Sequence, residues 1–118
     1  MALVIDFPPT KIDGAAEVEL TSFQNVRERE GRYSLYVKNT GTETVIVRYK
    51  YRDAGEAYPV QFSLDTDIEN IVPANESALI ILEAGEGQEQ LQILAIRETA
   101  DGGILEGKVT CRDDRGYR

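Results

Sequence analysis

The chain has 118 residues, of which 42% are hydrophobic, with a formal net charge of −8 and one cysteine. This length and composition suit a single domain with its own core. The acidity argues against nucleic acid as a partner, because phosphate binding needs clustered Lys and Arg. The single cysteine, Cys111, excludes an internal disulfide, and its place in an alternating run predicts a buried side chain.

The first apolar run, residues 3–7, ends at Pro8-Pro9, which cannot donate hydrogen bonds to a β-ladder. We therefore divide the chain into residues 1–9, an apolar arm or first edge strand, and residues 10–118, a single β-sandwich domain. An arm would dock on another subunit by strand addition, whereas an edge strand would pair within its own sheet. The run supplies four candidate interface residues: Leu3, Val4, Ile5 and Phe7.

Residues 18–23 form the next predicted strand, and three runs with period-two alternation follow, at 33–38, 45–52 and 58–64. Alternation of this kind places one set of side chains on a buried face and the other set in water. In the third run we expect Tyr58, Val60, Phe62 and Leu64 on the buried face.

Further strands are predicted at residues 78–82, 91–97 and 104–112, the last two joined by a turn at residues 100–103. Seven or eight strands, spaced by turn signals and without a helix-period segment, predict an all-β antiparallel sandwich. Some strands are apolar on both faces, which indicates that they are central or that something else, such as another subunit, covers them.

Two blocks, residues 36–47 (YVKNTGTETVIV) and 71–80 (IVPANESALI), resemble the immunoglobulin-like sandwich modules of bacteria and viruses. In those modules a V-x-N-T-G-x-x-x-V hairpin precedes a V-P-x-x-x-S strand entry, and the similarity covers residues 31–112. The chain departs from the vertebrate type, since it has neither a cysteine pair nor a tryptophan. The resemblance implies an antiparallel immunoglobulin-like β-sandwich and, by analogy, roles in adhesion, spacing or decoration.

Catalysis is not expected, because the chain has no histidine and no nucleophile-elbow or phosphate-loop pattern. Asp65, Asp67 and Glu69 alternate and offer oxygen ligands for calcium, but they lack the EF-hand spacing. We favour a solvated acidic loop there, and we predict neither a metal nor a cofactor.

Two further features are candidate interfaces. Arg48, Lys50 and Arg52 form a basic row that would contact an acidic partner or pair with Asp and Glu of this chain. Tyr36 lies on the polar phase of its strand and is the best candidate for an exposed aromatic side chain. A sugar-binding platform of Tyr49, Tyr51 and Tyr58 is an alternative, although their phase favours the core.

These features predict a non-catalytic structural or interaction module, which we interpret as a small virion component, a head-decoration or tail protein of a bacterial virus. The alternative is a carbohydrate-binding or adhesion module. The expected partner is protein, either a second copy or a larger assembly, and a homo-oligomer and carbohydrate binding are left open. A membrane is not expected, because no apolar run is long enough to cross one. Without a secretory signal in the sequence, we expect synthesis in the cytoplasm without export, and a place in a virion.

Overall fold

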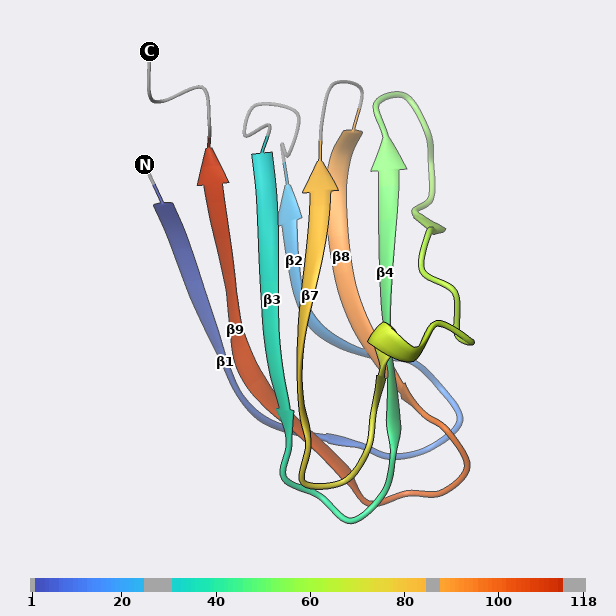
Figure 1. Cartoon of the computed structure of the whole chain (residues 1–118). Coiled ribbons are helices and arrows are strands. Elements are labelled where there is room, and N and C mark those ends of the chain that lie inside the picture. Colours follow the sequence, from blue (N-terminus) through green and yellow to red (C-terminus); the bar gives the residue numbers. More distant parts are fainter. Residues whose placement is uncertain (1, 25–30, 85–87, 114–118) are drawn as a thin grey trace.

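The computed structural model describes residues 2–24, 31–84 and 88–113, and the side chains of residues 4–23, 33–82 and 89–110. Two antiparallel sheets pack face to face (Figure 1), which confirms the predicted all-β sandwich. The long strands are β1 Ala2–Ile12, β2 Val18–Gln24, β3 Gly31–Asn39, β4 Val45–Asp53, β7 Ser77–Ala84, β8 Gln88–Arg97 and β9 Gly103–Asp113. Three short elements, β5 Val60–Gln61, η2 Ile68–Asn70 and β6 Ile71–Val72, lie between β4 and β7.

One sheet has the order β1-β9-β3-β7, and the other has the order β2-β8-β4-β5, with β6 also paired to β4. The chain between β4 and β7 therefore crosses from one sheet to the other along one side of the sandwich (Figure 1). Within the described residues, no helix is long and apolar enough to span a bilayer.

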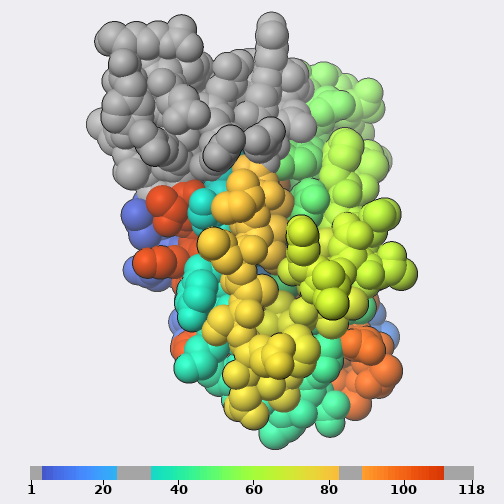
Figure 2. Space-filling view, viewed as in Figure 1, coloured from blue at the N-terminus to red at the C-terminus, as the bar shows by residue number. Residues whose placement is uncertain are grey.

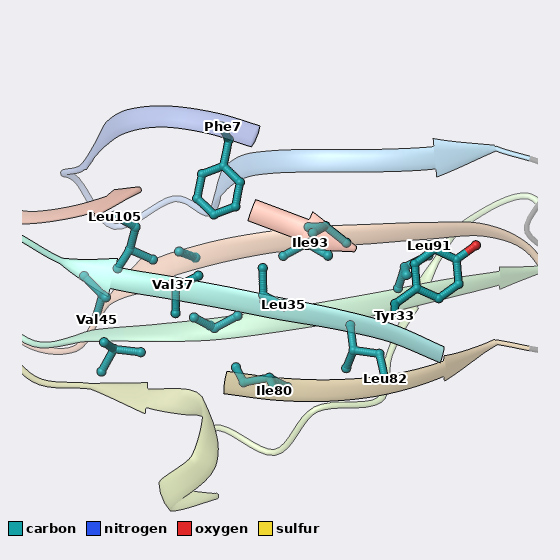
Figure 3. Packing of buried hydrophobic residues seen from close by; sticks show 14 of the residues in the cluster. Phe7, Tyr33, Leu35, Val37, Val45, Ile80, Leu82, Leu91, Ile93 and Leu105 are labelled. Carbon is teal, nitrogen blue, oxygen red and sulfur yellow. The ribbon is translucent and has the colours of Figure 1, made fainter. Parts of the chain in front are cut away.

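The core lies between the sheets and is built from the inward phase of each long strand. Fully buried side chains come from β3, β4, β8 and β9, where Figure 3 shows them interdigitating: Leu35, Val37, Val45, Leu91, Ile93 and Leu105. The period-two alternation predicted for these strands is thus the alternation between core and solvent.

Strand β1 extends beyond the predicted boundary, through Pro8-Pro9 to Ile12. It is an edge strand that pairs with β9, and its register shifts between Phe7 and Thr10. Prolines are tolerated at such a bulge on a sheet edge, because the ladder does not require an N–H donor at these positions. The first residues therefore pair within their own sheet.

Phe7 was predicted as an interface residue, and that prediction is wrong. Its side chain is only 6% exposed and points from β1 into the core (Figure 3). Ile5 is half-buried against the same core, whereas Val4 is exposed on the outer face. The side chains of Leu3 and Cys111, for which we predicted an interface and a buried position, lie outside the described side chains.

The third alternating run was also predicted wrongly. Only Val60–Gln61 pairs as a strand, and Tyr58, Val60, Phe62 and Leu64 are exposed rather than buried. In this run the polar residues Gln61, Ser63 and Asp65 are instead turned towards the protein.

The Asn39 side chain links the turns at one end of the sandwich by hydrogen bonds. Its buried amide donates to the carbonyls of Glu43 (2.7 Å) and Val72 (3.0 Å). Its side-chain oxygen accepts from the backbone N–H of Gly41 (3.0 Å) and of Ile104 (3.3 Å). One side chain thus joins the β3–β4 turn, β6 and the start of β9.

Candidate interaction surface

Arg48 is the centre of an ion-pair cluster on the outer face of β4. Its guanidinium binds Asp65 through two hydrogen bonds, Nε to Oδ1 at 3.0 Å and Nη2 to Oδ2 at 2.7 Å. It also donates from Nη1 to Glu17 at 3.1 Å, and the Lys50 ammonium donates to the same Glu17 carboxylate at 2.7 Å. A two-pronged contact of this kind fixes the orientation of both partners.

The contacts of this cluster shift the pKa values of Asp65, Arg48 and Glu17. The hydrogen bonds from Arg48 hold the pKa of Asp65 below its ordinary value, against a smaller opposing effect of burial. The same contact raises the pKa of Arg48. For Glu17, burial acts to raise the pKa, but hydrogen bonds from Lys50 and Arg48 together outweigh it and lower the pKa. These pKa shifts favour the charged forms of Asp65, Arg48 and Glu17.

The cluster anchors the segment of residues 58–68 to β4 by its polar side chains. Asp65 is held by Arg48, and the Gln61 amide donates to the Asp65 carboxylate (3.0 Å). The buried Ser63 hydroxyl accepts from the backbone N–H of Tyr49 (3.2 Å). Because these polar groups face the protein, the alternating apolar residues of the segment face solvent.

A hydrogen bond within the crossing holds the end of the segment near η2. The Asn70 side chain is buried and donates to the carbonyl of Leu64 at 3.2 Å. Helix η2 contacts both β7 and β4, so this end of the segment lies beside the edge of the other sheet. The bond from Asn70 shapes the end of the crossing, while the bonds of Asp65 and Ser63 attach the segment to β4.

Among the described side chains, seven of the nine large apolar residues that are exposed belong to two neighbouring parts of the chain, the 58–68 segment and β7, whose exposed surface we call the apolar face. Strand β7 lies next to the 58–68 segment (Figure 2). It forms one edge of the four-stranded sheet, and β1 forms the opposite edge. The outward residues of β7, Leu79 and Ile81, are apolar and exposed. The apolar face consists of Tyr58, Val60, Phe62, Leu64, Ile68, Leu79 and Ile81.

The apolar face is large for an uncovered surface. Its side chains are between 53% and 85% exposed, and Ile68 is the most exposed of them. At roughly 150–200 Å² for a fully exposed side chain of this size, the seven leave about 800 Å² of accessible area. The largest apolar patch on a typical monomer is about 300–600 Å², whereas one partner of a standard protein interface buries about 800 Å².

The outer face of the four-stranded sheet carries a second feature, a shallow depression of about 290 Å³ beside Tyr36. Its charged lining is mixed, with Asp6 and Glu106 beside Lys38 and Lys108. The Tyr36 ring is partly exposed, and its hydroxyl lies 3.2 Å from the Ser77 hydroxyl. The depression therefore offers an aromatic surface with hydrogen-bonding groups around it.

The proposed platform of Tyr49, Tyr51 and Tyr58 is not formed. Tyr51 is buried, and its ring meets those of Tyr49 (6.1 Å between centroids) and Phe62 (5.3 Å) edge-on. Tyr49 packs against the core, and Tyr58 stands exposed on the apolar face. Edge-on rings do not present the flat surface on which a sugar ring stacks.

The predicted site residues are thus dispersed. Val4 and Tyr36 are exposed on one outer face, and the basic row lies on the other sheet. Arg48 and Lys50 are paired within the chain, as described above. Arg52 donates to the Gln90 side chain (3.4 Å) and to the Glu56 carbonyl (3.2 Å).

Sequence reasoning missed Leu79 and Ile81, although the strand they belong to is apolar in both phases, which was the available signal. Of the acidic residues weighed as a calcium site, Asp65 binds Arg48, and Asp67 and Glu69 are exposed. Among the described residues, no group of three Asp, Glu or Cys side chains is arranged to hold a metal ion.

Comparisons with known proteins add information on the fold. No protein-family model and no curated protein sequence matches the chain. A crystal structure of PirA is similar with a TM-score of 0.58 and 15% identity, over 94% of this chain and 93% of that one. At this identity the similarity shows a shared sandwich fold and nothing further.

Two more solved structures are more distant. One comes from Bacillus endospore appendages described as a novel family of disulfide-linked pili, with a TM-score of 0.46, 14% identity, and 94% and 84% of the two chains covered. The other comes from the Gx strain of infectious bursal disease virus, with a TM-score of 0.49 and 9% identity. It covers 99% of this chain but only 33% of the viral one.

Proposed function

We propose that this chain is a non-catalytic binding module that is built into a larger protein assembly. The observation that supports this role is the apolar face: in its 58–68 segment polar side chains are held inward and large apolar side chains outward, and β7 adds the exposed Leu79 and Ile81. Burying each such side chain would contribute about 1.5–3 kcal/mol. A fold that instead fixes them in water by specific hydrogen bonds is best explained if another protein covers them.

The specific form that we propose is a small structural component of a bacterial virus, a head-decoration or tail protein. A single sandwich with an uncovered face of about 800 Å² is the size of unit that adds to a particle surface by one standard interface. The absence of histidine from the sequence agrees with a role that needs no acid–base chemistry.

The test is to follow the chain in lysates of the cells that make it, by gradient sedimentation and immunodetection. We expect the chain to sediment with particles that electron microscopy identifies in the same fractions. Recovery of the chain only among slowly sedimenting free proteins would contradict the proposed role.

A second candidate function is carbohydrate binding, which the depression beside Tyr36 favours. Carboxylates and ammonium groups at its rim are suited to the hydroxyls of a sugar, and the Tyr36 ring offers a face for its apolar side. A glycan array that shows binding by the unmodified chain, and loses it with Tyr36→Ala, would support this function. An array without binding would reject it.

A further inference from the structure

The net negative charge of the chain arises in the region that carries the apolar face. Residues 53–96 contain nine Asp and Glu and no Lys or Arg, while the rest of the chain contains twelve acidic and thirteen basic residues. The whole of the net negative charge therefore belongs to the chain between the end of β4 and the end of β8.

Exposed carboxylates border the apolar face. Asp67 and Glu69 flank Ile68, and both are exposed. Glu56 precedes Tyr58, and Glu76 comes immediately before β7; these two are exposed as well. The surface is thus an apolar centre with a carboxylate rim.

Among the residues whose side chains the structure describes, no ion pair involves Glu56, Asp67, Glu69 or Glu76. Arg48 is bound to Glu17 and Asp65, and Asp65 is the one carboxylate of the segment that it reaches. Arg52 donates to the Gln90 side chain and to a backbone carbonyl, so neither of these bonds uses a carboxylate. The charge that the rim presents to a partner is therefore negative.

We propose that the apolar face binds a different protein, whose docking surface is an apolar patch flanked by lysine and arginine. This inference rests on the proposed role as a binding module and adds the chemistry of the partner. Apolar contact would supply the affinity, and opposite charges at the rim would set the orientation and speed the encounter.

A second copy of the chain fits this face less well. A two-fold dimer brings the same patch of both copies together, so each carboxylate rim would lie against the other. Like charges brought together at an interface oppose binding. Nucleic acid and anionic membranes carry phosphates, which the same rim repels.

The proposal is tested with two short synthetic peptides of equal length, in which apolar residues alternate with lysine in one and with glutamate in the other. Binding to the intact, isotopically labelled chain is followed by NMR, at low ionic strength and at about 0.15 M. We expect the lysine peptide to shift amide signals of residues 58–68 and 77–82, to bind more weakly at the higher ionic strength, and to bind more tightly than the glutamate peptide.

Two variants separate the apolar and charged contributions. Leu64→Ser with Ile81→Thr should weaken binding of the lysine peptide about tenfold or more, because two large apolar contacts are lost. Asp67→Asn with Glu69→Gln should weaken it several-fold and reduce its dependence on salt. Val4→Ser, an equally exposed apolar residue outside the apolar face, is the matched control and should leave binding unchanged.

Three results would overturn the proposal: equal binding of the two peptides, unchanged binding by the Leu64→Ser, Ile81→Thr variant, or signal shifts confined to other surfaces. Sedimentation velocity of the free chain supplies a fourth. A dimer that the same variant abolishes would identify a second copy as the occupant. Sedimentation with particles is measured separately, so failure of the peptide test leaves the proposed function to be judged on its own result.

Discussion

Replacing Asn39 by alanine should strongly destabilise the sandwich, although the side chain removed is polar. The amide of Asn39 is completely buried and makes four hydrogen bonds, each to a main-chain group. The Asn39→Ala change leaves the carbonyls of Glu43 and Val72 and the N–H groups of Gly41 and Ile104 without that partner. Alanine supplies no replacement donor or acceptor.

The expected loss follows from these four groups. A buried main-chain group that loses its hydrogen bond costs about 1–3 kcal/mol. Thr40 and Thr42 in the same turn are exposed, so water can replace part of the lost bonding there. We therefore expect a loss of about 3–5 kcal/mol, a large share of the roughly 5–15 kcal/mol that stabilises a domain. The melting temperature should fall by about 10–20 °C.

The assay is urea unfolding followed by far-ultraviolet circular dichroism. The midpoint should shift while the dependence of the free energy on urea stays unchanged, since the variant exposes the same surface on unfolding. Thr40→Ala is the matched control; its side chain is exposed, and it should change stability by no more than about 0.5 kcal/mol. A loss below about 1 kcal/mol for Asn39→Ala would refute the role that we assign to this side chain.

Three further predictions concern stability and are checked by the same unfolding assay. Phe7→Ala should cost about 3–5 kcal/mol because Phe7 is in the core, whereas Val4→Ala should cost less than about 0.5 kcal/mol; similar small losses would mean that β1 is not held in the sandwich. Gly107→Ala should cost several kcal/mol, because a Cβ atom there would overlap the carbonyl oxygen of Tyr36, and a neutral result would show that the two strands lie farther apart. Asp65→Asn should cost less than about 1 kcal/mol at pH 7. Because the pKa of Asp65 is lowered in the folded state, this contribution is present above the ordinary carboxyl pKa and is lost as the pH falls through the lowered folded-state pKa. A difference between Asp65→Asn and the unmodified protein that does not decrease in acid would contradict the ion pair.

The sequence was sufficient to predict the strands whose apolar phase meets the core. Strands β3 and β4 alternate between apolar and polar residues, and the structure buries the apolar set in both. The limits of β1 were not predictable in the same way. An edge strand was one of the two positions that the sequence allowed for residues 1–9, but the prolines predicted its end there. The register shift between Phe7 and Thr10 carries the strand past them to Ile12, and this shift is seen only in the pairing of β1 with β9.

The failure at residues 58–64 has a different cause. Period-two alternation indicates that a segment has one apolar and one polar face, but it does not predict which of the two faces the protein. Here the choice depends on Arg48 and Tyr49 of β4, which bind Asp65 and Ser63 and so turn the polar phase inward. These contacts join residues that are distant in sequence, so a local sequence pattern does not predict them.

The candidate surface was partly accessible from the sequence. The concentration of acidic residues in 53–96 and the doubly apolar strand at residues 77–84 both mark this region. That the two belong to one face depends on the crossing between sheets, which brings η2 against β7. For the basic row, the sequence left open an acidic partner or pairing within the chain. Arg48 pairs with Asp65 of the 58–68 segment, and Lys50 pairs with Glu17.

The central claim is that the apolar face joins this chain to a larger assembly. The most direct measurement is the fraction of the chain that sediments with particles, compared for the unmodified protein, Leu64→Ser with Ile81→Thr, and the Val4→Ser control. Our account predicts at least a tenfold loss of incorporation for the double variant, unchanged incorporation for Val4→Ser, and unfolding midpoints close to that of the unmodified protein for both. Incorporation of the double variant at the level of the unmodified protein would contradict it.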